Sequence, residues 1–287
     1  QNVAVGNAAL NAMNPATATN MYNTAVGASA GLAVTTGLVN TLVGGLSGDA
    51  ITTGNDNTAF GYNSLTGNTA SNRNTAIGSQ ALATFNVTTD THTYNTAVGY
   101  NAGGAVTTGI QNTLLGGLAG DALTDADYNV AIGYIALTSD TLGSRSVAIG
   151  RGTLEVQNFT TATDVYNVAV GYKAGAAVTT GISNTLIGGL AGDALTTGQE
   201  NTVVGRSALT AEIAGRYNVA IGNAALAAQS NSSGADVYNT AVGYAAGGSV
   251  TTGQQNVFVG ATSGDALTEG NYNVVVGWSA GTHDVNL

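Results

Sequence analysis

The sequence predicts an all-β protein, a parallel β-solenoid, and three observations lead to that fold class. A pentapeptide motif of the type Asn-Thr-Ala-Val-Gly occurs sixteen times in the 287 residues. Successive copies lie 21, 17, 17 and 17 residues apart, in an order that repeats every 72 residues. The second residue of the motif is always Thr or Val, and the fourth is always bulky. Such strict repetition is typical of one structural unit stacked on itself.

Each repeat is expected to form one coil. β-Branched residues at alternate motif positions favour a short strand, and the closing glycine ends it because glycine tolerates a positive φ. A second, weaker strand is expected after each glycine, for example over 33–37 and 48–52, so that a coil holds two strands. With strands about 4.8 Å apart, sixteen coils would span about 77 Å.

The third residue of the motif is also apolar in every copy. Neighbouring residues of a strand point to opposite faces, so both faces of this strand are expected to need a cover. The other half of the same coil supplies one cover. A neighbouring subunit is the expected source of the second cover, which predicts lateral association.

The whole chain, 1–287, is expected to be a single repeat solenoid of four repeats of about 72 residues. It opens and ends inside a repeat, and no cap for an exposed strand edge is apparent. The chain is therefore expected to be a segment of a longer fibre, or to polymerise end to end.

Charge and composition exclude several classes of partner. Only 8% of the residues are charged and the net charge is −10, so neither nucleic acid nor membrane insertion is expected. There is no cysteine, which removes disulfides and thiolate metal sites. A surface built from Asn, Thr, Ser and Gly suits an extracellular, cell-surface or virion protein.

The first residue of the motif is asparagine in fifteen copies and Ser146 in the other. Stacked asparagines are expected to form a structural ladder of hydrogen bonds, and a polar binding stripe is the alternative. The ladder would consist of Asn2, Asn23, Asn40, Asn57, Asn74, Asn95, Asn112, Asn129, Asn167, Asn184, Asn201, Asn218, Asn239, Asn256 and Asn273.

The 21-residue coils carry the least regular sequence, at 11–20, 83–92, 155–164 and 227–236, and are expected to bulge as loops. Three of them contain an Asn-x-Ser/Thr acceptor pattern for glycosylation, at Asn86, Asn158 and Asn231. Chance occurrence in an Asn/Thr-rich chain is the alternative.

The tyrosines follow the same grid. Seven precede the motif asparagine, five follow the motif glycine, and Trp278 takes the latter place in the last copy. They are expected to pack along the shaft with their hydroxyls in water, and an aromatic sugar-binding row is the alternative.

No metal site, cofactor or catalytic residue is expected. The Gly-Asp-Ala aspartates (Asp49, Asp121, Asp193 and Asp265) are too sparse for calcium, which prefers several carboxylates at one site, so they are expected to cap turns. His92 and His283 have no repeated acid partner. The long coils offer only scattered acids, at Asp90, Glu155, Asp164 and Asp236, so an enzyme is not expected.

Ser146-Val147-Ala148-Ile149-Gly150 resembles the head repeats of trimeric autotransporter adhesins. Asn-Thr-Ala-Val-Gly with a following Tyr, as at 95–100, is similar to repeats in phage tail fibres. The resemblance covers all sixteen copies and implies a left-handed parallel β-roll that trimerises side by side and serves in adhesion. Those heads commonly use coils shorter than 17 or 21 residues.

These observations together favour a structural and adhesive fibre shaft, of a phage tail fibre or a bacterial surface adhesin. It would present its loops or a distal tip to a host-surface glycan or receptor. The alternative is a self-assembling extracellular filament or sheath with a purely structural role, and a depolymerising enzyme comes third.

Overall fold

The computed structural model describes residues 1–15 and 20–281. It confirms the predicted fold class: the described residues contain no helix, and sixteen of the eighteen strands form one parallel β-sheet stacked as a solenoid. By its contacts the chain divides into two units. The first comprises 1–144 with 160–163, and the second comprises 145–159 with 164–287.

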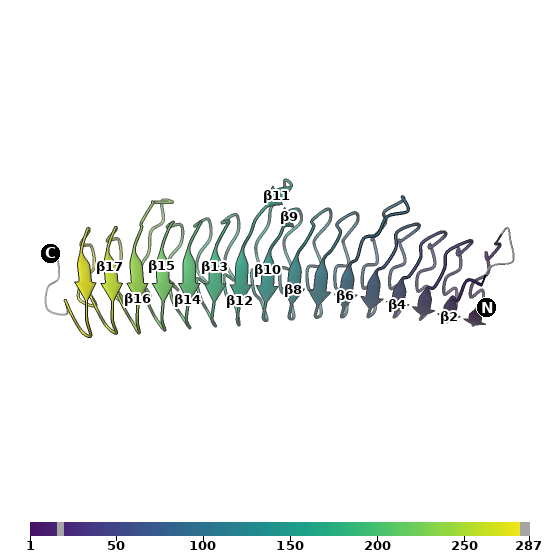
Figure 1. The fold of residues 1–287 in the computed structure, drawn as a ribbon, viewed down its shortest axis with the longest axis horizontal. Helices are drawn as coiled ribbons and strands as arrows, with labels where there is room; N and C mark the ends of the chain where they lie inside the picture. The colour runs from purple at the N-terminus through teal and green to yellow at the C-terminus, as the bar shows by residue number, and fades with distance from the viewer. Residues whose placement is uncertain (16–19, 282–287) are drawn as a thin grey trace. The chain divides into compact units, whose positions relative to one another are not determined.

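In the first unit, eight motif copies form strands that lie side by side and point the same way (Figure 1). Adjacent strands pair in strict register, with the third motif residue of one coil opposite that of the next, as for Ala97 and Leu114. The strands are β1 (Val3–Val5), β2 (Thr24–Val26), β3 (Thr41–Val43), β4 (Thr58–Phe60), β5 (Thr75–Ile77), β6 (Thr96–Val98), β7 (Thr113–Leu115) and β8 (Val130–Ile132).

The second unit repeats this arrangement, and its paired strands keep the same register, as for Ala169 and Leu186. Its strands are β10 (Val147–Ile149), β12 (Val168–Val170), β13 (Thr185–Ile187), β14 (Thr202–Val204), β15 (Val219–Ile221), β16 (Thr240–Val242), β17 (Val257–Val259) and β18 (Val274–Val276). A separate two-stranded sheet consists of β9 (Gly143–Ser144) and β11 (Thr163–Asp164).

The motif glycine ends each strand for two physical reasons. Its φ lies between 126° and 144°, a region that side chains other than glycine rarely adopt. The coils also approach closely here: a Cβ on Gly99 would lie 2.5 Å from the carbonyl oxygen of Gly116 in the next coil. Any side chain would therefore collide with backbone.

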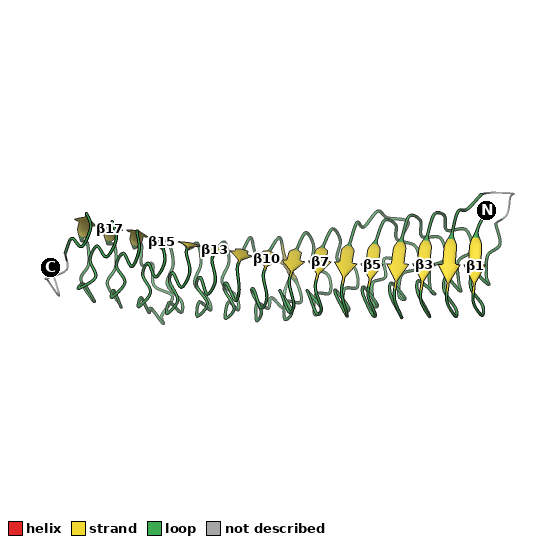
Figure 2. Ribbon diagram, turned by 90° about the horizontal axis from the view of Figure 1, so that it is seen from below, coloured by secondary structure: helices red, strands yellow, loops and turns green. Residues whose placement is uncertain are grey.

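The predicted second strand of each coil is wrong. Figure 2 shows the strands on one side of the coils and loops on the rest, and 33–37 and 48–52 contain no strand. After the motif glycine, every second residue again has a positive φ, as in Asn101 (53°) and Gly103 (58°). These left-handed residues bend the chain into successive turns, which an extended strand cannot accommodate.

The core lies inside each coil and is filled by complementary sizes. Where the third motif residue is alanine and the fourth residue after the glycine is large, as for Ala4 and Leu10, the latter fills the interior. Leu42 instead points at two glycines: a Cβ on Gly31 would lie 2.7 Å from its Cδ1, and one on Gly48 2.7 Å from its Cδ2. Leu42 is fully buried, so a large residue in the motif and a small one in the turn compensate each other.

Candidate functional site

The sheet has an inner and an outer face, and the outer face is apolar and exposed. Third motif residues such as Ala59 and Ala76 are fully buried inside the coil. The fourth residues point outward, so that Phe60 is 55% and Ile77 37% exposed. Equivalent residues in the second unit, Ile187, Ile221, Val242 and Val259, are exposed to a similar extent.

This outer face carries no charge of its own. None of the sixteen strands of the large sheet contains Asp, Glu, Lys or Arg. Exposed aliphatic residues therefore recur at every rung, about 4.8 Å apart, between threonine and valine side chains of the second motif position. Contiguous exposed apolar surface of this kind is typical of an interaction site.

Charged residues gather at the edge of the sheet, on the residue that precedes the motif asparagine. Arg73 donates from Nη1 to the Tyr94 hydroxyl at 2.7 Å and lies 3.6 Å from Asp56 through Nε. The hydrogen bond to Tyr94 and, to a smaller degree, the Asp56 charge raise the pKa of the Arg73 guanidinium. In the second unit Tyr217 stacks on Tyr238 at 4.9 Å, and the negative charge of Glu200 raises the pKa of Tyr217.

The fifteen motif asparagines form a continuous ladder within each unit. The Oδ1 of one asparagine accepts the backbone N–H of the next, over 2.8 to 3.2 Å. Asn40, for example, accepts from the Asn57 N–H at 3.0 Å and donates from Nδ2 to the Gly54 carbonyl at 2.8 Å. Except near the chain ends these side chains are buried, so they hold coils together and offer no binding stripe.

Ser146, the one departure from the ladder, is supported by a side chain from a long coil. Gln157 donates from Nε2 to Ser146 Oγ at 3.1 Å, and its Oε1 accepts from Asn167 Nδ2 at 2.9 Å. The longer glutamine thus bridges the gap that the short serine leaves.

The acids and the histidine of the long coils do not come together as a catalytic group. Asp90 accepts from Asn72 Nδ2 at 2.6 Å, and the His92 ring contacts the Tyr94 ring at 6.0 Å. Asp164 pairs with Arg145, and Asp236 lies 3.9 Å from Arg216. Glu155 lies beside Gly152, where an added Cβ would lie 2.9 Å from its Oε2. His283 falls outside the described residues.

The Gly-Asp-Ala aspartates contact a threonine one coil further on. Thr138 Oγ1 donates to Asp121 at 2.5 Å and Thr210 Oγ1 to Asp193 at 2.5 Å, while Thr66 donates to Asp49. Across 1–15 and 20–281, no three His, Cys, Asp or Glu side chains lie close enough together to hold a metal ion.

The three acceptor asparagines differ in their surroundings. Asn158 is exposed, and Asn86 is half-buried with its Oδ1 accepting from Thr69 at 2.8 Å. Asn231 is only 7% exposed, and its Nδ2 donates to Glu212 at 3.0 Å. A glycan on that nitrogen would have to displace this buried hydrogen bond.

Expression in a host with N-glycosylation is therefore expected to modify Asn158 and to leave Asn231 unmodified, since only the former is exposed. Mass spectrometry of the two peptides checks this expectation. A glycan found on Asn231 would contradict the buried position of its side chain.

Sequence reasoning missed a buried polar position, the seventh residue after the motif glycine in the fourth coil of a repeat. Asn68, Asp140 and Glu212 occupy it, and all three are fully buried. Glu212 Oε1 accepts the backbone N–H groups of Ile213, Ala214, Gly215 and Asn231, and its Oε2 accepts from Gln229 Nε2 at 2.7 Å. The carboxylate therefore organises a turn from inside. Its recurrence at the 72-residue period was the available signal.

Glu212→Gln is expected to lower the free energy of unfolding by about 2–4 kcal/mol, because an amide nitrogen would face N–H donors inside the core. Thermal or denaturant unfolding measures the change, and the exposed Glu200→Gln serves as the control. Equal stability of both variants would show that Glu212 is not needed as an acceptor.

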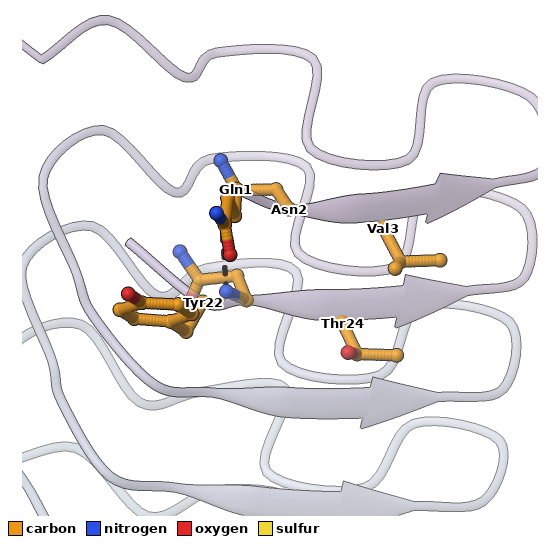
Figure 3. A pocket seen from close by; sticks show the side chains of 6 residues that line it. Gln1, Asn2, Val3, Tyr22 and Thr24 are labelled. Atoms are coloured by element: carbon orange, nitrogen blue, oxygen red, sulfur yellow. Dashed lines mark hydrogen bonds between the residues drawn. The ribbon is translucent and has the colours of Figure 1, made fainter. Parts of the chain in front are cut away.

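A hollow of ≈ 430 Å³ lies over the first two rungs (Figure 3). Its lining contains no His, Asp, Glu, Lys or Arg side chain, so it offers neither an acid–base pair nor a charged anchor. The lining residues are Gln1, Asn2, Val3, Tyr22, Asn23 and Thr24.

Comparison with known proteins finds no matching family model, no matching curated protein and no matching solved structure. In the described part of the chain, no helix has the length and apolar character needed to cross a membrane. Function is therefore argued from the surface of the solenoid.

Proposed function

We propose that the chain is part of a structural and adhesive fibre outside the cell or on a virion. It would form the shaft of a phage tail fibre or a segment of a bacterial surface adhesin. The observation that carries the proposal is the outer face of the sheet, which is apolar and exposed at every rung although the interior is already filled. Side-by-side association of copies through this face would bury it.

The resemblance of the motif to trimeric adhesin heads and tail fibres supports a homotrimer with left-handed coils. The ladder of buried asparagines supports a mechanical role, because every coil is tied to the next by side-chain and backbone hydrogen bonds. Adhesion to a host-surface glycan or receptor would then use the remaining surface. A filament or sheath with a purely structural role is the alternative.

The mass of the chain in solution tests lateral association. Light scattering is expected to give three times the 28.2 kDa of one chain. Ile77→Lys, which places a charge on the outer face, is expected to dissociate the oligomer. Asn101→Lys is the matched control, because Lys173 stands at the equivalent place one repeat later. A monomeric wild type, or an unchanged oligomer for Ile77→Lys, would contradict the proposed interface.

Negative-stain microscopy of the native source separates the roles. Tapered fibres on virions or cells are expected for a shaft, whereas long uniform filaments would favour the alternative. Loss of capsule on incubation with the protein would instead favour a depolymerising enzyme.

A further inference from the structure

The residue that follows the motif glycine alternates between aromatic and small in the first unit. Tyr62, Tyr100 and Tyr134 follow β4, β6 and β8, whereas Ser79 and Gly117 follow β5 and β7. The 72-residue repeat contains four coils and does not require an alternation of two. This shorter period therefore belongs to the surface and not to the way the coils stack.

Backbone hydrogen bonds hold this row in register. The Gln80 N–H donates to the Tyr62 carbonyl, the Asn101 N–H to the Ser79 carbonyl and the Leu118 N–H to the Tyr100 carbonyl, each at 2.9 Å. Consecutive tyrosines are thus separated by two rungs, about 10 Å. Their spacing is fixed by the fold before any ligand arrives.

The rings lie over small residues of the preceding coil. A Cβ on Gly117 would lie 3.6 Å from Cδ2 and 4.0 Å from Cε2 of Tyr134, and one on Gly45 3.6 Å from Cδ2 of Tyr62. Neither glycine has a positive φ, so backbone conformation does not require glycine there. The space beneath the ring is the physical reason for the small residue.

The three rings remain accessible above this support. Tyr62 is 57%, Tyr100 60% and Tyr134 51% exposed. A ring that rests on backbone with one side and meets solvent with the other is a flat platform. Platforms of this kind suit a ligand that is itself a row of flat, weakly polar rings.

We infer that the row Tyr62–Tyr100–Tyr134 binds an extended, neutral β-1,4-linked polysaccharide of pyranose sugars, such as a cellulose- or chitin-type chain. The C–H faces of pyranose rings stack on aromatic rings. In a β-1,4-linked chain every second sugar presents the same face, and two sugars span about two rungs, roughly 10 Å. The inference rests on the proposed adhesive role and names its ligand class.

The charge of the protein selects among polysaccharides. A net charge of −10 repels anionic polymers, so a neutral chain is favoured. The second unit carries a less complete row, with Tyr172, Tyr244 and Trp278, because Arg206 stands where the alternation would place an aromatic residue. The first unit therefore holds the longest uninterrupted set.

Co-sedimentation of the full chain with microcrystalline cellulose, chitin and granular starch tests the inference. Binding to cellulose or chitin is expected, and comparison of the two identifies the sugar. Tyr100→Ala is expected to weaken binding about three- to tenfold, and replacement of all three tyrosines by alanine to abolish it. Tyr22→Ala with Tyr128→Ala, on the opposite edge of the strands, is the control and should bind as wild type.

The double variant Ser79→Tyr with Tyr100→Ala tests spacing directly, since it keeps the number of rings but moves one of them by a rung. It is expected to bind as weakly as Tyr100→Ala, with unchanged thermal unfolding. Wild-type binding by this variant, or equal binding to starch, would overturn the inference.

Two further outcomes separate this inference from the proposed function. Failure to bind any β-1,4-linked chain by a protein that still forms fibres and attaches to cells would overturn the inference alone. Tyrosine variants that change the oligomer mass but not glycan binding would assign the row to a contact between copies, which also overturns it.

Discussion

Gly99→Ala is expected to lower the free energy of unfolding by roughly 3–5 kcal/mol, or to prevent folding of the first unit. Gly99 has a φ of 138°, which an alanine rarely adopts. Its Cβ would also lie 2.5 Å from the Gly116 carbonyl oxygen and 2.6 Å from its carbonyl carbon. Relief of this collision requires two coils to separate, which breaks hydrogen bonds on both sides.

The control for this variant is Gly117→Ala, a glycine on the same coil stack. Gly117 has no positive φ, and the nearest atom to its added Cβ is a tyrosine ring carbon 3.6 Å away. Its effect on stability is expected to stay within about 0.5 kcal/mol. Denaturant unfolding compares the two, and similar losses for both would show that close approach of coils at the motif glycine is not what requires glycine.

Asn40→Ala is expected to destabilise the first unit by about 2–5 kcal/mol, because it leaves the Asn57 N–H and the Gly54 carbonyl without partners in the interior. Asn40 is fully buried and lies in the middle of a run of ladder residues. Asn40→Asp keeps the acceptor but places a carboxylate against the Gly54 carbonyl, so it is expected to be at least as harmful.

Asn7→Ala provides the matched comparison for the ladder, since Asn7 is exposed and lies outside it. Hydrogen exchange would localise the effect: the amide of Asn57 should lose protection in Asn40→Ala and keep it in Asn7→Ala. Retained protection at Asn57 would show that Asn40 Oδ1 is not its essential acceptor.

The strands and their stacking were predictable because one short motif determines both. Thr96, Ala97 and Val98 form a strand for local reasons, and the constant interval places each copy over the previous one. The inward direction of the third residue also follows from strand alternation. No longer-range information is needed for these features.

The rest of the coil was predicted wrongly because its sequence resembles a strand. Ala33-Val34-Thr35-Thr36 has high β-propensity, but residues such as Leu10 and Leu82 adopt φ values of 50° and 48° in the corresponding coils. Leucine is disfavoured in that region when isolated. Here burial of its side chain offsets the cost, and that burial is known only once the coil has closed.

Parts of the surface were equally hidden from sequence reasoning. Glu212 has the composition of a surface residue, yet the turn it organises surrounds it completely. The tyrosine row was visible as a pattern, but its two-rung alternation gains meaning only when the register of the coils gives a distance between rings. In both cases a long-range contact supplies the missing information.

The most direct test of the stacked arrangement is a set of electron-spin distances between outward threonines. The chain has no cysteine, so spin labels can be placed at chosen pairs. Pairs that join Thr113→Cys to Thr96→Cys, Thr75→Cys, Thr58→Cys and Thr41→Cys are separated by one to four rungs. The backbone separation is expected to grow by about 4.8 Å per rung, to about 19 Å for the last pair. Distances that do not increase in this even series would contradict a parallel, in-register stack.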